Sequence, residues 1–198
     1  ARAMGRPVKL IYSREDDVQL DVHRSLTYQV VRGGADANGT ITAIKHDVVS
    51  GWPTKRQARG VPALEGLIGP DSEGIDPFAM NGSDHWYTVP NQSVRAILND
   101  MVQSAAPPGQ LRSVAPGWTF FALESFLDEM AHKLNRDPVE LRLSMLDATG
   151  KNAGTPPNSV GGAKRLANVL QVAVGRAGWK TKALPENTGR GVACVPSQ

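Results

Sequence analysis

The stretch Thr119-Phe-Phe-Ala-Leu-Glu-Ser-Phe-Leu-Asp-Glu-Met-Ala-His-Lys-Leu134 decides the fold of the second half of this chain. Its apolar residues recur at spacings of three and four, and they are Phe120, Phe121, Leu123, Phe126, Leu127, Met130, Ala131 and Leu134. Charged residues fall mainly between them, so a helix would carry these charges on its opposite side. The pattern therefore predicts an amphipathic helix with one buried face.

Two carboxylates of this helix allow two interpretations. Glu124 and Asp128 lie four residues apart, so their side chains would meet if both pointed into a cleft. On an amphipathic helix such residues more often form the solvent-exposed side, and we favour this second interpretation.

Two further helices follow this one. Asp137 precedes Pro138, and Glu140 stands three residues after Asp137, which is the arrangement of a capped helix start with proline in the first turn. This helix should run to about Asp147. After a linker at 151–162 that is rich in Gly, Pro and Asn, helical spacing returns with Leu166, Val169, Leu170, Ala173, Val174 and Ala177. Gly178 can end that last helix in the left-handed conformation.

The first half of the chain is mainly β. Strand character occurs at residues 6–13, 25–33, 40–50, 85–89 and 93–98. The second and third of these segments are separated by turn formers, which predicts a hairpin. Residues 51–83 are rich in Gly, Pro, Asp and Ser and are expected to form a long loop. Strands followed by helices predict an α+β fold.

The composition excludes several classes of protein. The net charge is +3, from 22 basic and 19 acidic residues, and no run of like charges marks a nucleic-acid-binding arm. A single cysteine, Cys194, excludes an internal disulfide framework and a multi-cysteine zinc or iron–sulfur site. No apolar stretch approaches the roughly eighteen residues of a membrane span. The four histidines lack metal-site spacing, so no metal site is expected from this chain alone.

Two polar segments could carry chemistry. Arg14-Glu-Asp-Asp17 could supply a general acid or base, but we favour a solvated strand end with an Arg–carboxylate pair. The segment Pro107-Pro-Gly-Gln-Leu-Arg-Ser-Val-Ala-Pro-Gly117 leads into the start of the predicted helix, where free amides and the helix dipole favour an anion. A tight loop, with Arg112 paired to a carboxylate or capping a helix end, is an equally good interpretation.

Several motifs together resemble one family. Gly5-Arg-Pro-Val-Lys-Leu-Ile-Tyr-Ser-Arg-Glu-Asp-Asp17 resembles a segment of the large subunits of molybdenum hydroxylases, which include xanthine dehydrogenases and aldehyde oxidoreductases. In family order follow His23-Arg24, Asn38-Gly-Thr-Ile-Thr-Ala43, Tyr87-Thr-Val-Pro-Asn91, Leu111-Arg-Ser113, Phe121-Ala-Leu-Glu-Ser-Phe-Leu-Asp-Glu-Met-Ala131 and Asp137-Pro-Val-Glu-Leu-Arg142. The match covers nearly the whole chain, and the sequence of these motifs is most similar to the isoquinoline 1-oxidoreductase beta subunit.

The resemblance implies a position within a larger protein. Residues 1–100 would be the mainly β portion and residues 101–198 the mainly helical portion of one molybdopterin-binding domain, truncated at both ends. The chain lacks an initiator methionine and closes on an apolar stretch, 191–198, that is expected to begin a strand. We therefore expect an internal fragment that is inactive alone, with exposed apolar patches and marginal stability.

The resemblance also implies a site. Leu111, Arg112 and Ser113 would bind the cofactor, and Val114 would face the substrate. The cofactor would be molybdenum-molybdopterin, in its cytosine dinucleotide form. The general-base glutamate of the family is expected outside this chain, so no catalytic residue is assigned here.

The implied reaction is oxidation of a small molecule, an aldehyde or an N-heterocyclic aromatic, with water as the oxygen source. Electrons would pass to iron–sulfur clusters on a small [2Fe-2S] subunit, and the other partner would be the remainder of the large subunit. Localisation stays open between cytoplasm and periplasm. The competing hypothesis is a non-catalytic protein-interaction or scaffold module, which could show the same β-rich half and amphipathic helices.

Two departures from the xanthine dehydrogenase pattern concern substrate choice. The family sequence Phe-Arg-Gly-Phe-Gly is replaced by Leu-Arg-Ser-Val-Ala at residues 111–115, so Val114 offers no aromatic stacking wall for a flat purine. Phe78 stands near the position of a substrate-binding arginine. Both departures argue against xanthine as the substrate.

Overall fold

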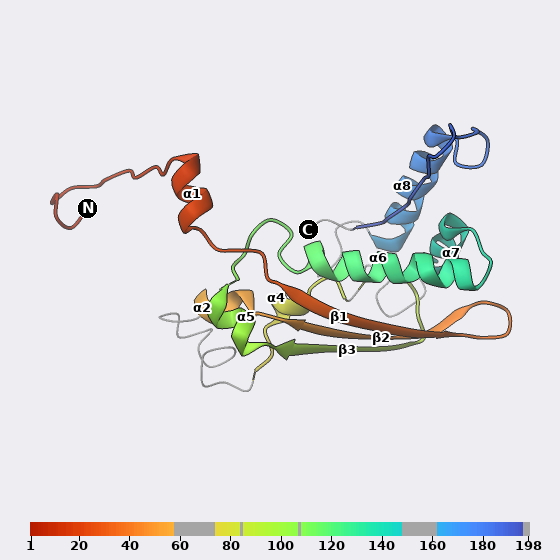
Figure 1. Ribbon diagram of the computed structural model, residues 1–198, viewed down its shortest axis with the longest axis horizontal. Helices are drawn as coiled ribbons and strands as arrows, with labels where there is room; N and C mark the ends of the chain where they lie inside the picture. The colour runs from red at the N-terminus through yellow and green to blue at the C-terminus, as the bar shows by residue number, and fades with distance from the viewer. Residues whose placement is uncertain (58–73, 84, 107, 148–161, 196–198) are drawn as a thin grey trace.

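The computed structural model describes residues 1–57, 74–83, 85–106, 108–147 and 162–195. Strands β1 (Thr27–Ala35), β2 (Ile41–Ser50) and β3 (Asn91–Leu98) form one sheet in the order β1-β2-β3. The helices are α1 (Arg14–Leu20), α2 (Pro53–Gln57), α4 (Pro77–Met80), α5 (Asp100–Ala105), α6 (Pro116–Lys133), α7 (Pro138–Met145) and α8 (Gly162–Ala177). The predicted α+β fold, with a β-rich first half and helices later, is confirmed (Figure 1).

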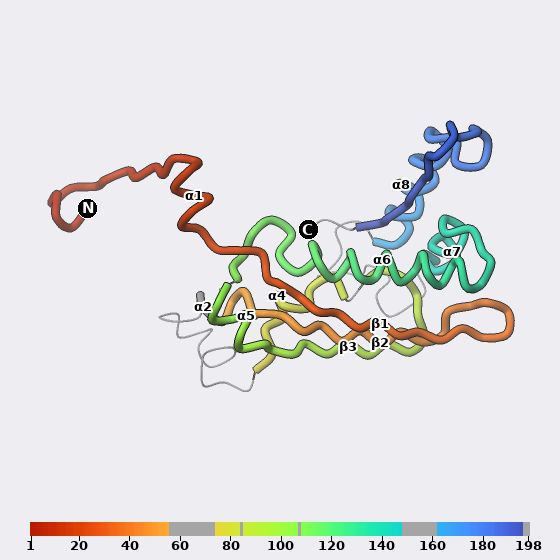
Figure 2. Tube along the Cα trace, in the orientation of Figure 1, coloured from red at the N-terminus to blue at the C-terminus, as the bar shows by residue number. Residues whose placement is uncertain are grey.

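The predicted hairpin is confirmed as β1 and β2, which pair antiparallel. Its turn is stabilised by Asp36, whose Oδ1 accepts from the amides of Asn38 and Thr40 at 2.9 Å each. Gly39 has φ +77°, a conformation that glycine adopts without steric cost. Arg136 donates from Nη1 to the Gly39 carbonyl oxygen at 3.1 Å. This contact fixes the turn against the end of α6, where Figure 2 shows the two chain segments approaching.

The third strand pairs in a way that the sequence did not predict. β3 runs parallel to β2, with Ala43 opposite Asn91 and Ser50 opposite Leu98, so β2 is central. The prediction of a strand at 85–89 is wrong, because this segment is irregular while Tyr87 and Val89 are buried in the core. Its apolar residues are needed for packing against α6 and α7, not for strand pairing.

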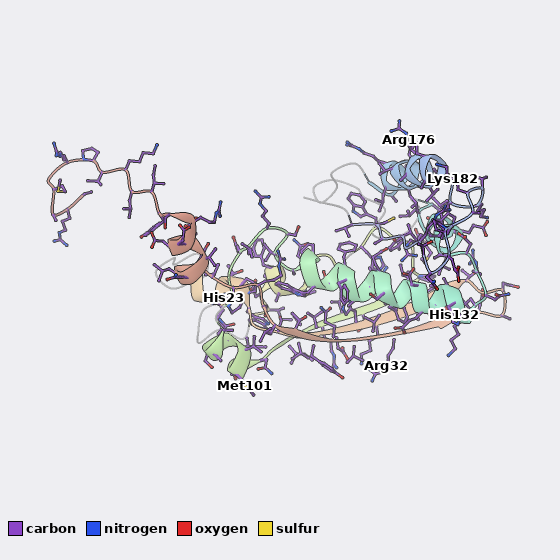
Figure 3. All side chains as sticks on the ribbon, turned by 45° about the horizontal axis from the view of Figure 1, so that its top comes forward. His23, Arg32, Met101, His132, Arg176 and Lys182 are labelled. Atoms are coloured by element: carbon purple, nitrogen blue, oxygen red, sulfur yellow. The ribbon has the colours of Figure 1, made fainter. Side chains whose placement is uncertain are left out.

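Helix α6 lies along one face of the sheet (Figure 1) and confirms the predicted amphipathic helix. Its buried face joins Ile41 and Ile44 of β2 in the main core, which also contains Tyr87, Val89, Phe120, Leu123, Leu127, Met130, Ala131, Val139, Leu141, Met145, Leu146, Ala163, Leu170 and Cys194. Burial of this apolar area supplies most of the stabilisation of the fold. In Figure 3 the labelled Arg32 points away from α6, on the other face of the sheet.

The start of α7 and the end of α8 are as predicted, whereas α7 ends at Met145, two residues before the predicted end, and α8 already begins at Gly162, the last residue of the predicted linker. Asp137 caps α7 by accepting from the amides of Val139 and Glu140 at 2.9 and 3.0 Å, and Pro138 occupies its first turn. Gly178 follows α8 with φ +62°. The predicted linker at 151–162 lies outside the described residues, apart from its last residue.

The prediction of a strand at residues 6–13 is wrong. These residues have no regular structure, and Ser13 instead caps α1 through a capping box with Asp16. A strand needs a hydrogen-bonding partner, and no bridge to this segment occurs within the described residues. Residues 14–17 accordingly form the first turn of a helix, not a strand end, although Arg14 and Asp17 do pair at 3.9 Å.

The last described residues also differ from expectation. Residues 189–195 are not in a strand, and residues 196–198 lie outside the described part of the chain. The expected long loop at 51–83 contains α2 and α4, and its central part, 58–73, is likewise outside the description. Among the described helices, none is both long and apolar enough to cross a membrane.

Exposed apolar side chains are numerous, as the sequence predicts. Those on the N-terminal arm are Met4, Val8, Leu10, Ile11, Tyr12, Val18 and Leu20, all at least half exposed. Helix α1 buries no residue at all, and Figure 1 shows it away from the sheet. Phe121 on α6 is 77% exposed. Contiguous apolar patches on a protein surface commonly mark protein, membrane or ligand interaction surfaces.

Candidate functional site

The site predicted from the sequence lies in the loop that precedes α6. The amide of Leu111 donates to the Gly109 carbonyl oxygen at 3.0 Å, and the amide of Val114 donates to the Leu111 carbonyl oxygen at 2.8 Å. Ser113 and Val114 have φ +65° and +37°, in the left-handed region. That conformation costs an L-residue about 1–2 kcal/mol, and strain of this kind gathers at functional sites. The loop is thus a tight turn held in a strained form.

The same loop and the first turn of α6 present exposed amide groups. Within the described residues, the amides of Arg112, Ser113 and Gly117 donate no hydrogen bond, and these three residues are exposed. Ala115 is the N-cap of α6, and its methyl group cannot accept a hydrogen bond from the amides of the first turn. Free amides beside the start of an 18-residue helix create a positive potential that attracts anions and hydrogen-bond acceptors.

Arg112 extends this positive potential. Its side chain is exposed, and within the described part of the chain it enters neither an ion pair nor a hydrogen bond. The interpretation of Arg112 as the partner of a nearby carboxylate therefore finds no support among these residues. Its neighbour Leu111 is 41% exposed. The loop offers a cation and free amides side by side.

Val114 lies at the inner side of the loop. Its half-buried side chain packs against the small cluster of Val48, Ala115 and Trp118. The Trp118 indole donates from Nε1 to the Ala79 carbonyl oxygen at 3.3 Å, which attaches α4 to the start of α6. The structure therefore brings α4, the helix that contains the 39%-exposed Phe78, to the first turn of α6.

The first turn of α6 is also fixed from the sheet. Gln29 donates from Nε2 to the Trp118 carbonyl oxygen at 2.9 Å, and its Oε1 lies 2.6 Å from His46 Nε2. Because Gln29 Oε1 accepts, neutral His46 donates from Nε2. Burial lowers the pKa of His46 to about 4, although the Asp47 carboxylate acts in the opposite direction. His46 is therefore a neutral, structural residue near pH 7.

A residue that the sequence reasoning missed contacts the site loop from far along the chain. The Arg24 guanidinium donates from Nη2 to the Arg112 carbonyl oxygen at 2.9 Å and reaches the Val114 carbonyl oxygen with Nη1 at 3.4 Å. Arg24 belongs to the motif His23-Arg24, but the sequence does not indicate which carbonyl groups an arginine will contact.

The carboxylates of α6 do not form a second site. Glu124 is buried and accepts from Tyr87 Oη, Arg142 Nε and the Cys194 amide, each at 2.8 Å. Asp128 lies 2.8 Å from Arg142 Nη1. The favoured interpretation of both as solvent-exposed is wrong for Glu124, because Arg142 neutralises its charge inside the protein. With its charge paired, Glu124 ties α6 to α7 and to the C-terminal segment.

Two potentially reactive groups beside Glu124 are held protonated. Burial first, and the Glu124 charge second, raise the pKa of the Cys194 thiol to about 11 and that of Tyr87 well above its usual value. A thiol of this kind is not a nucleophile at neutral pH. Groups of three or more potential metal ligands do not occur among the described residues.

Comparisons with known proteins found one family model and several relatives. A family model described as "Molybdopterin cofactor-binding domain" matches residues 1–146. The chain is 43% identical over 194 residues to "Membrane-bound aldehyde dehydrogenase [pyrroloquinoline-quinone]" of Gluconacetobacter polyoxogenes, covering 98% of this chain and 25% of that protein. It is 30% identical to "Isoquinoline 1-oxidoreductase subunit beta" of Brevundimonas diminuta, covering 77% of this chain and 18% of that protein.

A solved structure agrees at the level of the fold. The chain matches the aldehyde oxidoreductase from Desulfovibrio gigas with a TM-score of 0.56 and 23% sequence identity. The match covers 92% of this chain and 19% of the other. This chain therefore spans between about a fifth and a quarter of the length of the proteins that it matches.

Proposed function

The chain belongs to the family of molybdopterin cofactor-binding domains, and from this premise we infer that it supplies part of the cofactor and substrate site of a molybdenum hydroxylase. In this proposal residues 1–100 and 101–198 are the mainly β and mainly helical portions of one larger domain. Leu111, Arg112 and Ser113 contact the cofactor, and Val114 faces the substrate.

The observation that carries the proposal is the set of free donors in one loop. The exposed amides of Arg112, Ser113 and Gly117 and the Arg112 guanidinium, which is unpaired among the described residues, fit a cofactor that carries phosphate and many hydrogen-bond acceptors. The donor set contains no thiolate, imidazole or carboxylate cluster, so these residues suit the organic part of the cofactor and not direct ligation of the metal.

When bound, the molybdenum cofactor supplies the redox chemistry by which a substrate carbon is oxidised with oxygen from water. This chain binds the cofactor and orients it relative to the substrate. Arg112 and the loop amides hold acceptor groups of the cofactor, and the strained turn fixes these donors before binding. Val114, backed by Trp118 and Val48, forms an aliphatic wall that excludes water from the substrate side.

The aliphatic wall guides the choice of substrate. Val114 has no ring to stack on a purine, which favours an aldehyde or a differently held N-heterocycle over xanthine. The two relatives are named for aldehyde and for isoquinoline oxidation, and both names agree with this substrate class.

The partners in this proposal are the remainder of the large subunit and a small [2Fe-2S] subunit that removes the electrons. The cytosine dinucleotide form of the cofactor is part of the same proposal. A lone cysteine, buried and protonated, suits a chain that leaves iron–sulfur clusters to a partner.

Cofactor analysis of the full-length protein tests the proposal, and it must separate two cofactors. One relative is named for pyrroloquinoline quinone, whereas the family model is named for molybdopterin. We would purify the co-expressed full-length protein, measure molybdenum by mass spectrometry, and identify released pterin and quinone by chromatography. We expect about one molybdenum and one pterin per subunit, with aldehyde oxidation by an artificial acceptor. Quinone without molybdenum would refute the proposal, and a folded protein with neither would favour the scaffold hypothesis.

A further inference from the structure

The segment Val22–Ser25 runs beside the loop that carries the proposed cofactor contacts. His23 forms an isolated parallel bridge with Pro108, and the Gly109 amide donates to the His23 carbonyl oxygen at 3.0 Å. Figure 1 shows this segment, which follows α1, passing beside the loop before α6, and Figure 3 labels His23 at the junction. Two parts of the sequence that are more than eighty residues apart thus meet at the start of the loop.

Arg24 continues this contact to the other end of the loop. Its guanidinium lies on the carbonyl oxygens of Arg112 and Val114, the residues on either side of Ser113. A planar guanidinium offers several N–H groups in a fixed fork, so one side chain can hold two carbonyl groups at a set separation. The two contacts span the residues with positive φ, where the loop has the highest conformational cost.

Two glycines make this approach possible. A Cβ on Gly109 would come within 2.1 Å of Val22 Cγ2, and a Cβ on Gly117 would come within 2.2 Å of Arg24 Nη1. Neither glycine has a positive φ, so the backbone conformation does not demand glycine at these positions. The absent side chains instead leave room for the segment Val22–Ser25.

We propose that Arg24 is a positioning residue of the candidate site: it holds the loop Leu111–Val114 in its strained form and thereby sets where Val114 stands relative to the substrate. Arg24 engages the carbonyl groups of Arg112 and Val114, and the amides of Arg112 and Ser113 remain as the donors toward the cofactor. The part that concerns the substrate rests on the proposed function, whereas the part that concerns the loop does not.

The test uses the full-length protein and four variants. Arg24→Gln removes the charged fork, and Arg24→Lys keeps the charge but cannot hold both carbonyl groups as a fork does. Gly117→Ala keeps Arg24 and displaces its guanidinium. Arg176→Gln is the control, since Arg176 is exposed on α8 (Figure 3) and forms no hydrogen bond or ion pair within the described residues.

The first readout is hydrogen–deuterium exchange of amides 109–118. We expect Arg24→Gln and Gly117→Ala to raise exchange in this loop about tenfold, as loss of two hydrogen bonds predicts, with a smaller rise for Arg24→Lys and none for Arg176→Gln. Wild type and variants are compared at the same cofactor content, because a bound cofactor would itself protect the amides of Arg112 and Ser113. Loop exchange that stays at the control level in both Arg24→Gln and Gly117→Ala would overturn the proposal.

The second readout is the steady-state kinetics of aldehyde oxidation, normalised to molybdenum content. A displaced Val114 should raise KM more than it lowers kcat, with partial recovery in Arg24→Lys. Faster loop exchange with an unchanged KM would refute the substrate role of Arg24. Absence of molybdopterin from the wild-type protein would instead refute the proposed function, and the exchange readout would still decide whether Arg24 holds the loop.

Discussion

Replacing Arg142 by Met tests whether the buried network at the centre of α6 stabilises the fold. The Arg142 side chain is completely buried and donates from Nε to Glu124 Oε2 at 2.8 Å. It also bonds the carbonyl oxygens of Glu124 and Pro138 at 3.0 Å each, and it pairs with Asp128 at 2.8 Å. Met fills a similar volume but leaves the Glu124 carboxylate buried and without a cation.

The magnitude follows from that uncompensated charge. Loss of one partner of a buried pair costs about 3–5 kcal/mol, a large fraction of the roughly 5–15 kcal/mol that stabilises a typical domain. Tyr87 and the Cys194 amide still donate to Glu124, so we expect the lower half of that range. The free energy of unfolding would be measured by urea titration, with tryptophan fluorescence as the signal.

Two matched variants complete this prediction. Glu124→Gln combined with Arg142→Met removes both charges, so it should recover much of the loss from Arg142→Met alone. Lys180→Ala breaks an ion pair with Glu140 between two exposed side chains and should leave the unfolding midpoint unchanged. If the double variant is as unstable as Arg142→Met, or if Arg142→Met costs less than about 1 kcal/mol, buried charge pairing is not what holds α6 to α7.

Three further predictions concern other parts of the chain. The pKa of His46 is about 4 in the folded protein, below its usual 6.5, so the unfolded state binds more protons between these two pH values. The free energy of unfolding should therefore fall by about 3 kcal/mol in total as the pH drops from 6.5 to 4. His46→Gln should remove this pH dependence, which is measured as the midpoint of urea unfolding. Gly39→Ala should lower the free energy of unfolding by about 1 kcal/mol through its φ of +77° alone. Gly82→Ala should lower it more, because a Cβ at Gly82 would also lie 2.5 Å from Thr119 Oγ1. Thermal unfolding compares the two variants, and equal losses of stability would count against close packing of the segment after α4 on α6. Val114→Phe should raise the ratio of kcat/KM for a flat N-heterocycle over that for an aldehyde by up to about tenfold through stacking, and an unchanged ratio would show that Val114 does not face the substrate.

Helices and hairpin were predictable because their signals are local. The spacing of apolar residues in α6, the Asp137 cap of α7 and the turn around Gly39 each act within a few residues along the chain. The strand expected at 6–13 failed for the opposite reason, since alternation of side chains cannot supply a strand partner. The parallel pairing of β3 with β2 likewise depends on a crossover of about forty residues, whose course the sequence pattern does not indicate.

The loop proposed as the site could be recognised in the sequence, but the contacts that hold it could not. The loop around Arg112 was recognisable from its turn residues and its place before a helix. Arg24 was not, because its contacts join residues 88 and 90 positions apart. Glu124 was assigned to the solvent side because its neutralising partner, Arg142, lies on another helix. Long-range polar contacts leave no periodic trace in a sequence, whereas burial of an apolar face does.

The start and the middle of α6 therefore have separate tasks. At its start, the Trp118 carbonyl oxygen accepts from the Gln29 side-chain amide of the sheet, and the Trp118 indole N–H donates to the Ala79 carbonyl oxygen of α4. Trp118 therefore fixes the positions of both the site loop and α4. Near its middle, Glu124 and Arg142 bind α6 to α7 and to the C-terminal segment. Substitutions around Trp118 should therefore alter substrate preference at modest cost in stability, whereas those around Glu124 should cost stability without changing preference. Variants that break this division would mean that α6 transmits changes along its length.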